Sequence, residues 1–446
     1  MFRTKLSGSI IILFLFLMFL LLIISVNAEL YNWDCPNCGR TGNSGNYCGT
    51  CAQPAPWISS DPTPESYSET TVNSWKELQQ IINAIEGNQT IVLSTDISAE
   101  QDDTSIIIPS ETSITINLQG HCINRASTES QNDGSVFIIH SKASLTIFDE
   151  TKTGRITGGH TKELGGAIYN EGSLVINGVI IEGNTASQGG GLFIEYDAIV
   201  EINDSYINMN TADKDGGAIY SHGNITITNS VIHGNICYGG GAGIWSDGTA
   251  TLESVEIDKN LNAVNGGGIA SHGITTISNS IIRQNTASTA GGAIFHGNNS
   301  KPGFEASLSL NGVSIEDNTA QKYGGGIYLN NGSINLQGKT TISKNGAQKN
   351  GGGLFYSDGD LLVQDSVIVQ ANISNKKEND IHIQGQQILT LSGPLNKDAH
   401  IGIHLQNSGR MFITDYNKYS SVNPDLVFFD NSGKKVLLKD NEVIVK

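Results

Sequence analysis

Between residues 165 and 372 the chain repeats a short pattern of glycine and aliphatic residues. Two or three glycines, with or without an alanine, precede one aliphatic residue, and successive copies lie 24–27 residues apart, with one step of 33. The aliphatic positions are Ile168, Leu192, Ile219, Ile244, Ile269, Ile294, Ile327 and Leu354. A period of this length indicates a repeat architecture.

An asparagine keeps the same period, at Asn184, Asn210, Asn235, Asn260, Asn285, Asn318, Asn345 and Asn372. Three residues before each of them stands a β-branched aliphatic: Ile181, Ile207, Ile232, Ile257, Ile282, Ile315, Ile342 and Val369. Two patterns that stay in phase over eight periods define one structural unit.

Within one period, apolar and polar residues alternate as they do in β-strands. Ile225 and Ile227, for example, alternate with Thr226 and Thr228, and glycine, asparagine and serine separate the strands as turns require. Three short strands per period predict an all-β fold, a right-handed parallel β-helix whose aliphatic columns face inward. We expect glycine to supply positive φ at the corners. We also expect the asparagine to adopt the left-handed conformation and to bond to the asparagines above and below it.

The flanking segments predict caps for this solenoid. Residues 74–86 read as a helix with Ser74 and Glu77 as a capping box, suited to cover the first coil. Together with strands from residue 90 onward it opens a repeat domain over 73–375. Residues 376–446 keep strand alternation without the repeat and are expected to form terminal β coils or a small β cap.

The first residues predict export. Residues 1–28 read as a signal peptide, with Arg3 and Lys5 before an apolar run from Ile10 to Ile24. A retained membrane anchor is the alternative. After signal removal we expect no membrane span, and an extracellular or cell-surface location.

Four cysteines form a separate module at residues 29–57, which a Pro- and Ser-rich linker at 58–72 joins to the repeats. Cys35 and Cys38 form one Cys-x2-Cys pair, and Cys48 and Cys51 form another. Two such pairs can complete a tetrahedral structural Zn²⁺ site, and the module resembles a zinc ribbon. Two disulfides are the alternative for an exported chain. Cys237 occupies a slot held by alanine in other repeats, so we expect it, and Cys122 likewise, to be a small core residue.

Net charge limits the partners. The formal charge of −17 makes nucleic acid and anionic membranes poor partners. Among acidic residues, Glu195, Asp197, Asp213 and Asp215 are expected to cluster near adjacent corners. They are read as solvated turn residues, with a weak Ca²⁺ site as the alternative. Arg155 and Arg283 are isolated cations in the sequence.

The glycine phrases resemble the GGA[ILV] signature of polymorphic outer membrane protein repeats, as at Gly165–Ile168, Gly216–Ile219 and Gly291–Ile294, with IxxN in place of that family's FxxN. The resemblance covers roughly residues 90 to 420. It implies a pectin-lyase-like fold, a surface or extracellular location and, in some members, adhesion.

Two functions of different classes follow. The favoured one is a non-catalytic, adhesin-like scaffold that binds a carbohydrate or a cell-surface protein, with no catalytic residues assigned. The alternative is a polysaccharide-acting lyase or hydrolase, because β-helix folds also carry such enzymes. The phrases Ser221-His222-Gly223 and Ser271-His272-Gly273 recur at one repeat position, so they are interpreted as turns.

The cysteine spacing makes a prediction about metal content. Full-length protein purified without chelator should carry one Zn²⁺ per chain, held by Cys35, Cys38, Cys48 and Cys51. Elemental analysis measures the metal, and replacing Cys38 and Cys48 with serine should abolish it. Two disulfides by mass spectrometry in a zinc-free chain would establish the alternative.

Overall fold

The computed structural model describes residues 69–85, 89–126, 133–297, 305–405 and 410–446. These residues belong to one compact unit, Ser68–Lys446. The predicted signal peptide, the cysteine module and nearly all of the linker lie outside the described residues, so the predictions made for them stay predictions.

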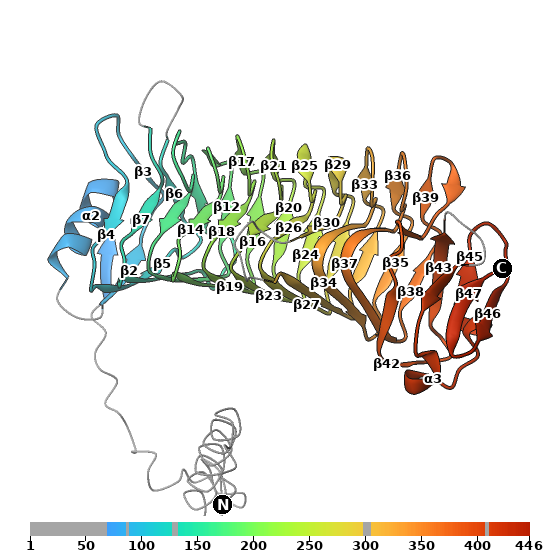
Figure 1. The fold of residues 1–446 in the computed structure, drawn as a ribbon. Helices are drawn as coiled ribbons and strands as arrows, with labels where there is room; N and C mark the ends of the chain where they lie inside the picture. Colours follow the sequence, from blue (N-terminus) through green and yellow to red (C-terminus); the bar gives the residue numbers. More distant parts are fainter. Residues whose placement is uncertain (1–68, 86–88, 127–132, 298–304, 406–409) are drawn as a thin grey trace, which may run out of the picture. The chain divides into compact units, whose positions relative to one another are not determined.

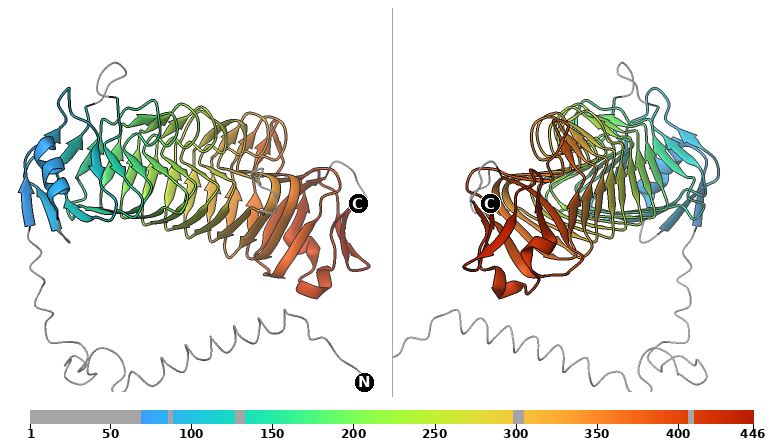
Figure 2. Two further views of the ribbon diagram at one scale, coloured as in Figure 1. Left: turned by 60° about the vertical axis from the view of Figure 1, so that its left-hand side comes forward. Right: turned by 90° about the vertical axis from the view of Figure 1, so that its right-hand side faces the viewer.

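The described chain winds into a parallel β-solenoid of about 12 turns, with 53% of residues in strands and 5% in helices. Figures 1 and 2 show the coils stacked side by side along one axis. Equivalent residues of neighbouring coils pair in register, for example Ile219 with Ile244 and Ile232 with Ile257. The predicted parallel β-helix is therefore confirmed.

Each coil contributes one strand to each of three ladders, named here faces A, B and C. Face A contains β4 (Ile106–Ile108), β7 (Phe137–Ile139), β10 (Ile168–Asn170), β14 (Leu192–Ile194), β18 (Ile219–Ser221), β22 (Ile244–Ser246), β26 (Ile269–Ser271), β30 (Ile294–His296), β34 (Ile327–Gln337), β37 (Leu354–Asp365), β41 (Ile381–Ile383) and β43 (His400–Leu405).

Face B follows face A around each coil. It contains β1 (Glu69–Val72), β2 (Gln89–Leu93), β5 (Ser113–Asn117), β8 (Ser144–Phe148), β11 (Ser173–Asn177), β15 (Ile199–Asn203), β19 (Asn224–Thr228), β23 (Thr249–Glu253), β27 (Ile274–Ser278), β31 (Ser307–Asn311), the second halves of β34 and β37, and β42 (Leu389–Leu395).

Face C precedes the asparagine corner. It contains β3 (Ile97–Ser98), β6 (Cys122–Asn124), β9 (Arg155–Thr157), β12 (Ile180–Glu182), β16 (Tyr206–Asn208), β20 (Val231–His233), β24 (Glu256–Asp258), β28 (Ile281–Arg283), β32 (Ser314–Glu316), β35 (Thr341–Ser343), β38 (Ile368–Gln370), and then β43 and β45 (Phe428–Asp430).

A fourth series of short strands, which forms two separate ladders, was not predicted. It lies between the asparagine and the glycines of each coil, and we call this part of each coil the arm. Figure 1 shows the arm strands as a row along the upper edge of the solenoid. They are β13 (Thr185–Ala186), β17 (Thr211–Ala212), β21 (Ile236–Cys237), β25 (Ala263–Asn265), β29 (Thr286–Ala290), β33 (Thr319–Ala320), β36 (Gly346–Ala347) and β39 (Ile373–Ser374), followed by the antiparallel β40 (Lys377–Glu378). One ladder runs from β13 to β21 and the other from β25 to β40.

The inward columns are the predicted ones. The eight aliphatic residues from Ile181 to Val369 on face C are fully buried, and so are those from Ile168 to Leu354 on face A. They belong to one continuous hydrophobic core that runs the length of the solenoid. Stacked coils thus share a core that no single coil could form.

The corners use positive φ as predicted for glycine but not for asparagine. The glycine three residues before each inward aliphatic of face A, from Ile168 to Leu354, has φ between 60° and 67°. At the other corner the expectation was wrong, because the residue before each ladder asparagine, and not the asparagine itself, has positive φ. These residues are Gly183, Met209, Gly234, Lys259, Gln284, Asp317, Lys344 and Ala371, with φ of 51–67°.

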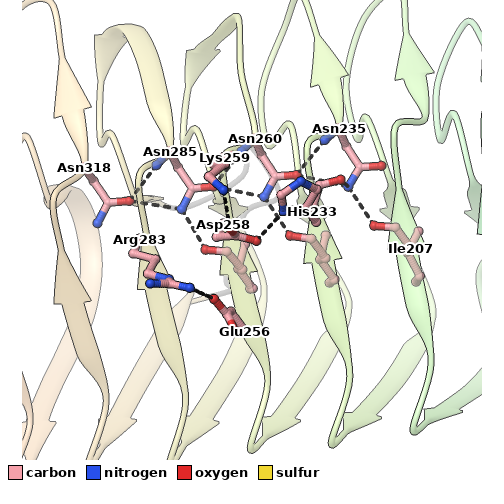
Figure 3. A network of polar contacts seen from close by, with 12 residues as sticks. Ile207, His233, Asn235, Glu256, Asp258, Lys259, Asn260, Arg283, Asn285 and Asn318 are labelled. Carbon is pink, nitrogen blue, oxygen red and sulfur yellow. Dashed lines mark hydrogen bonds and ion pairs between the residues drawn. The ribbon is translucent and has the colours of Figure 1, made fainter.

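The asparagines form a continuous buried ladder, shown in part in Figure 3. Asn260 represents all eight, since each is fully buried. Its Oδ1 accepts hydrogen bonds from the backbone N–H (2.9 Å) and Nδ2 (3.0 Å) of Asn235. Its Nδ2 donates to Oδ1 of Asn285 (2.9 Å) and to the carbonyl of Ile232 (3.0 Å). The bonding between coils predicted for these side chains is confirmed.

A carboxylate ends the ladder. The backbone N–H and Nδ2 of Asn372 donate to Oδ1 of Asp380, at 2.9 and 2.7 Å. Oδ2 of Asp380 accepts a bond from Nδ2 of Asn431 (2.8 Å), which lies in the C-terminal segment. Asp380 is fully buried, and this desolvation raises the pKa of its carboxyl group.

Helix α2 (Trp75–Ala84) covers the first coil, as predicted. Ser74 is its N-cap and accepts a bond from the N–H of Glu77 (3.3 Å). The Gln79 side chain bonds both backbone groups of Ile107 on β4, accepting from its N–H at 2.7 Å and donating to its carbonyl at 3.1 Å. A side-chain amide thus occupies the place of a neighbouring strand at the open edge.

The last 70 residues combine two expected features. Strands β41, β42, β43 and β45 continue the parallel stack. An antiparallel sheet of β44 (Met411–Ile413), β46 (Val436–Lys439) and β47 (Glu442–Val445) follows, with the short helices α3 (Tyr416–Tyr419) and α4 (Pro424–Val427). Among the described residues, no helix has the length and apolar character needed to span a membrane.

The two cysteines of the solenoid differ. Cys237 is fully buried beside Ala212, as expected, and desolvation raises the pKa of its thiol to about 12. Cys122 is only half-buried in β6 and is not a core residue, because the inward position belongs to Ile123. That part of the expectation was wrong.

Replacing a central asparagine tests the ladder. Asn260→Ala removes four hydrogen bonds: those from the N–H and Nδ2 of Asn235, and those to the carbonyl of Ile232 and to Oδ1 of Asn285. We expect the free energy of unfolding to fall by about 2–6 kcal/mol, since each of the four buried hydrogen bonds contributes roughly 0.5–1.5 kcal/mol. Urea unfolding measures it, with exposed Asn224→Ala as control. Equal stability of the two variants would contradict this role.

Candidate functional site

Face A carries a row of aromatic side chains on its outer surface, here called the aromatic column. Its members are Tyr169, Phe193, Tyr220, Trp245, Phe295, Tyr328, Phe355, His382 and His404. Stacked neighbours have ring centroids 4.2–5.7 Å apart and planes within 3–26° of each other. The column follows from strand alternation, because each ring is the residue after an inward aliphatic of face A.

One coil lacks an aromatic residue at this position and fills the gap from the next turn. Ala270 stands where its neighbours have Trp245 and Phe295. The His272 ring lies between them, with centroids at 5.4 and 5.6 Å. Its Nδ1 donates to the Gly297 carbonyl (2.9 Å), and burial lowers its pKa. The column is therefore continuous across this coil.

Stacking limits what the column can offer a ligand. Where ring planes are parallel, the neighbouring rings cover both faces of each ring, and only its edge points outward. Phe193, Tyr220 and Phe355 are each less than 7% exposed. The column therefore stabilises the outer surface of face A, and ligand contacts fall to ring edges, phenol groups and the polar residues beside it.

The N-terminal part of the column is acidic. The Tyr169 hydroxyl donates to carboxylate oxygens of Glu195 (2.9 Å) and Glu171 (3.2 Å). Burial raises the pKa of Tyr169, and these two carboxylates raise it further. Burial also raises the pKa of Tyr220, with Asp215 and Asp247 nearby adding to the effect. These tyrosines stay neutral donors at physiological pH.

His222, beside this part of the column, contacts both a carboxylate and aromatic rings. One ring nitrogen, Nδ1, lies 2.7 Å from Oδ1 of Asp247 in the next coil. Tyr196 stacks on the imidazole at 4.2 Å and is itself 51% exposed. His222 lies in the turn after β18, where the sequence placed it, but its side chain packs among aromatic rings.

The two Ser-His-Gly phrases do not form serine–histidine pairs. Ser221 and Ser271 end face A strands with their side chains fully buried inside the solenoid, whereas the histidines that follow lie outside. Inside, Ser271 Oγ lies 3.1 Å from Nδ1 of His296, but neither residue has any exposed surface. A substrate has no access to that pair.

The predicted acidic corner residues have separate roles. Glu195 accepts from Tyr169, and Asp215 accepts from the N–H of Gly240 at 2.6 Å. Asp197 and Asp213 are exposed. Within the part of the chain that the structure describes, no group of three or more His, Cys, Asp or Glu side chains is arranged to hold a metal ion.

The cations that looked isolated in the sequence are paired across coils. Arg155 contacts Glu182 at 2.7 Å, and Arg283 forms an ion pair with Glu256, which Figure 3 shows. Both pairs lie on the outer side of face C. Because both guanidinium groups are paired, neither is available to bind an acidic substrate.

Two hollows flank the arm. The larger, about 510 Å³, is lined by Asn262, Thr286, Ala287, Ser288, Thr319, Ala320, Gln321, Gly346, Ala347, Gln348 and Ile373. It contains no ionisable side chain and so offers no acid or base. The other, about 320 Å³, lies over the C-terminal part of the aromatic column.

Sequence reasoning missed the aromatic column, although its signal is visible. The residue after the aliphatic in each glycine phrase reads Tyr, Phe, Tyr, Trp, Ala, Phe, Tyr, Phe along the chain. The predictions used the glycines and the inward aliphatic positions, so this third periodic position was not recognised. The four cysteines predicted to bind Zn²⁺ lie outside the described residues.

Comparison with known families agrees with the repeat architecture. Residues 312–330 match the model of the Chlamydia polymorphic membrane protein repeat. The match contains the Ile315–Asn318 pair and the glycines at 324–326. No curated protein and no solved structure matches the chain. The chain is thus a β-helix repeat protein with a repeat similar to those of polymorphic membrane proteins. This similarity is consistent with a surface protein.

Buried histidines make stability depend on pH. Desolvation lowers the pKa of both His296 and His382 to about 4, against 6.5 for an exposed histidine. As pH falls below 6.5, the unfolded chain takes up protons before the folded chain does. Stability is therefore full above pH 6.5 and declines toward pH 4, by about 2 kcal/mol for each histidine at pH 5.

Urea unfolding at pH 7 and pH 5 measures this loss. His296→Leu, which copies Leu329 of the next coil, should lose about 2 kcal/mol less than the wild type between the two pH values. The same pH dependence in both proteins would show that His296 titrates normally.

Proposed function

We propose that this chain is an exported surface scaffold that holds a glycan or a cell-surface protein against the aromatic side of its solenoid, without acting on it chemically. The observation that carries the proposal is the aromatic column, which places ring edges and polar side chains along successive coils. Parallel stacking repeats this surface at roughly 4.8 Å intervals. An extended partner can therefore contact several coils at once.

The match to a polymorphic membrane protein repeat supports the surface location. The exposed ring of Tyr196 supports partner binding, because one of its faces lies on His222 while half of its surface is open to solvent. Exposed aromatic rings are frequent contact residues for sugars and proteins, since they bury a large area at little entropic cost.

A polysaccharide-acting enzyme is the second candidate. The His222–Asp247 pair favours it, because a carboxylate that orients an imidazole is a common arrangement in acid–base catalysis. Glycoside hydrolysis, however, commonly uses two carboxyl groups on either side of the scissile bond. Near His222, the Glu195 carboxylate is engaged by the Tyr169 hydroxyl. The scaffold is therefore the better supported function.

Two exposed tyrosines provide a matched test of the binding surface. Tyr196 beside the column and Tyr206 on face C are 51% and 47% exposed. Tyr196→Ala should weaken binding of the full chain to glycan panels or cell surfaces about five- to tenfold, the effect of losing one aromatic contact. Tyr206→Ala should leave binding unchanged. Equal effects would reject the column side.

Product assays on the same samples separate the two functions. The scaffold predicts no reducing ends and no unsaturated products from any polysaccharide in the panel, for the wild type and for His222→Ala. Product release by the wild type that His222→Ala abolishes, with an unchanged melting temperature, would establish the enzyme.

A further inference from the structure

The smaller hollow beside the arm has a composition that selects a ligand class. It lies over strands β34, β37 and β41 of face A, and two arm residues form its other wall. Its lining residues are Tyr323, Tyr328, Asn350, Phe355, Ser357, His382 and Gln384. A volume of about 320 Å³ is at the lower end of the range for small-molecule sites.

At this place the arm wall adds a tilted ring beside the regular stack of the column. The Tyr323 ring is tilted by 42° to Phe355 and by 47° to Tyr328, whereas Tyr328 and Phe355 are parallel within 6°. Tyr323 and Asn350 face each other in adjacent arms as a paired bridge. The ring of the arm residue Tyr323 thus forms the wall of the hollow, and rings of the column form its floor.

All the polar groups of the lining are uncharged at physiological pH. Asn350 and Gln384 each offer both a donor and an acceptor, and Ser357 Oγ donates to Oε1 of Gln384 (3.0 Å). His382 is 4% exposed, and its Nδ1 has no hydrogen-bond partner in the described structure. Burial keeps this imidazole neutral.

We propose that this hollow binds one neutral pyranose unit of a glycan, with its hydroxyls bonded to Asn350 and Gln384 and its C–H groups against the tilted ring of Tyr323. Sugar hydroxyls both donate and accept, as side-chain amides do, so the two sets of groups are complementary. The inference rests on the proposed scaffold function and assigns it a site and a ligand class.

The absence of charge in the lining argues against other ligands. Its residues include no aspartate, glutamate, lysine or arginine, so a uronate or a sulfated sugar finds no cation within the lining. The neighbouring ammonium group of Lys349 lies over the Tyr323 ring, 5.4 Å from its centroid, as a cation–π contact. The formal charge of −17 on the whole chain also disfavours an anionic glycan. A neutral unit loses nothing to either effect.

Binding of defined oligosaccharides to the full chain tests the proposal. The probes are cellohexaose and chitohexaose as neutral chains and hexagalacturonate as an acidic one, measured by calorimetry at pH 7. Asn350→Ala and Gln384→Ala should each weaken binding of at least one neutral probe about tenfold, the ratio expected for one or two neutral hydrogen bonds.

Gln321→Ala and Gln348→Ala are matched controls, because these amides line the larger hollow on the other side of the arm. They should leave the neutral probe bound as tightly as the wild type does, and all four variants should keep the wild-type melting temperature. Equal affinity in all four variants overturns this site while leaving the scaffold function in place.

Binding of hexagalacturonate alone, or of none of the three probes, overturns the neutral ligand class. The Tyr196 and Tyr206 comparison on cell surfaces then decides whether the scaffold function itself fails.

Discussion

Parallel stacking in register is the constraint on which the rest of this molecule depends. Because each residue lies beside its counterpart in the next coil, any side chain that repeats along the sequence must be compatible with a copy of itself. Aliphatic residues meet this condition by packing, aromatic residues by parallel stacking, and asparagines by donating and accepting at the same time. The core, the aromatic column and the asparagine ladder are three solutions to one geometric requirement.

Each of these solutions occupies a different part of a coil. The asparagine ladder bonds to buried backbone groups at the corner where the arm leaves face C. The arm can therefore project without leaving backbone N–H groups unpaired at this corner. The projecting arm in turn creates a wall beside face A. The hollow that contains Tyr323 and His382 lies between this wall and face A.

Most of the fold was predictable because its determinants are periodic. The inward columns from Ile181 to Val369 and the helix that begins after Ser74 were read from spacing alone. What failed were features that depend on backbone detail within a period. Positive φ falls on Met209 and Lys259 rather than on the asparagines that follow, because the asparagine must aim its amide along the axis.

The candidate site was harder to predict for a related reason. Outward positions carry no requirement for burial, so their periodicity attracts less notice than that of the core. His272 is the clearest example. Its ring completes the column where Ala270 lacks one, although His272 lies two residues later in the chain, in a turn and not at the repeat position of the column. Depth and shape of the hollows depend on the arm, which the sequence did not predict as a separate series of strands.

Asp380 ends the asparagine ladder and shows that the ladder has a direction. Between neighbouring asparagines, each Nδ2 donates to the residue on the C-terminal side and each Oδ1 accepts from the residue on the N-terminal side, so all these bonds run in one direction. Asp380 differs from asparagine by one atom, an oxygen in place of the nitrogen, and an ionised carboxylate has no proton to pass on. It acts like the terminating unit of a polymer. Whole repeats inserted or deleted upstream would leave this terminator and its partner Asn431 untouched, so the length of such a protein can change in single-coil steps during evolution.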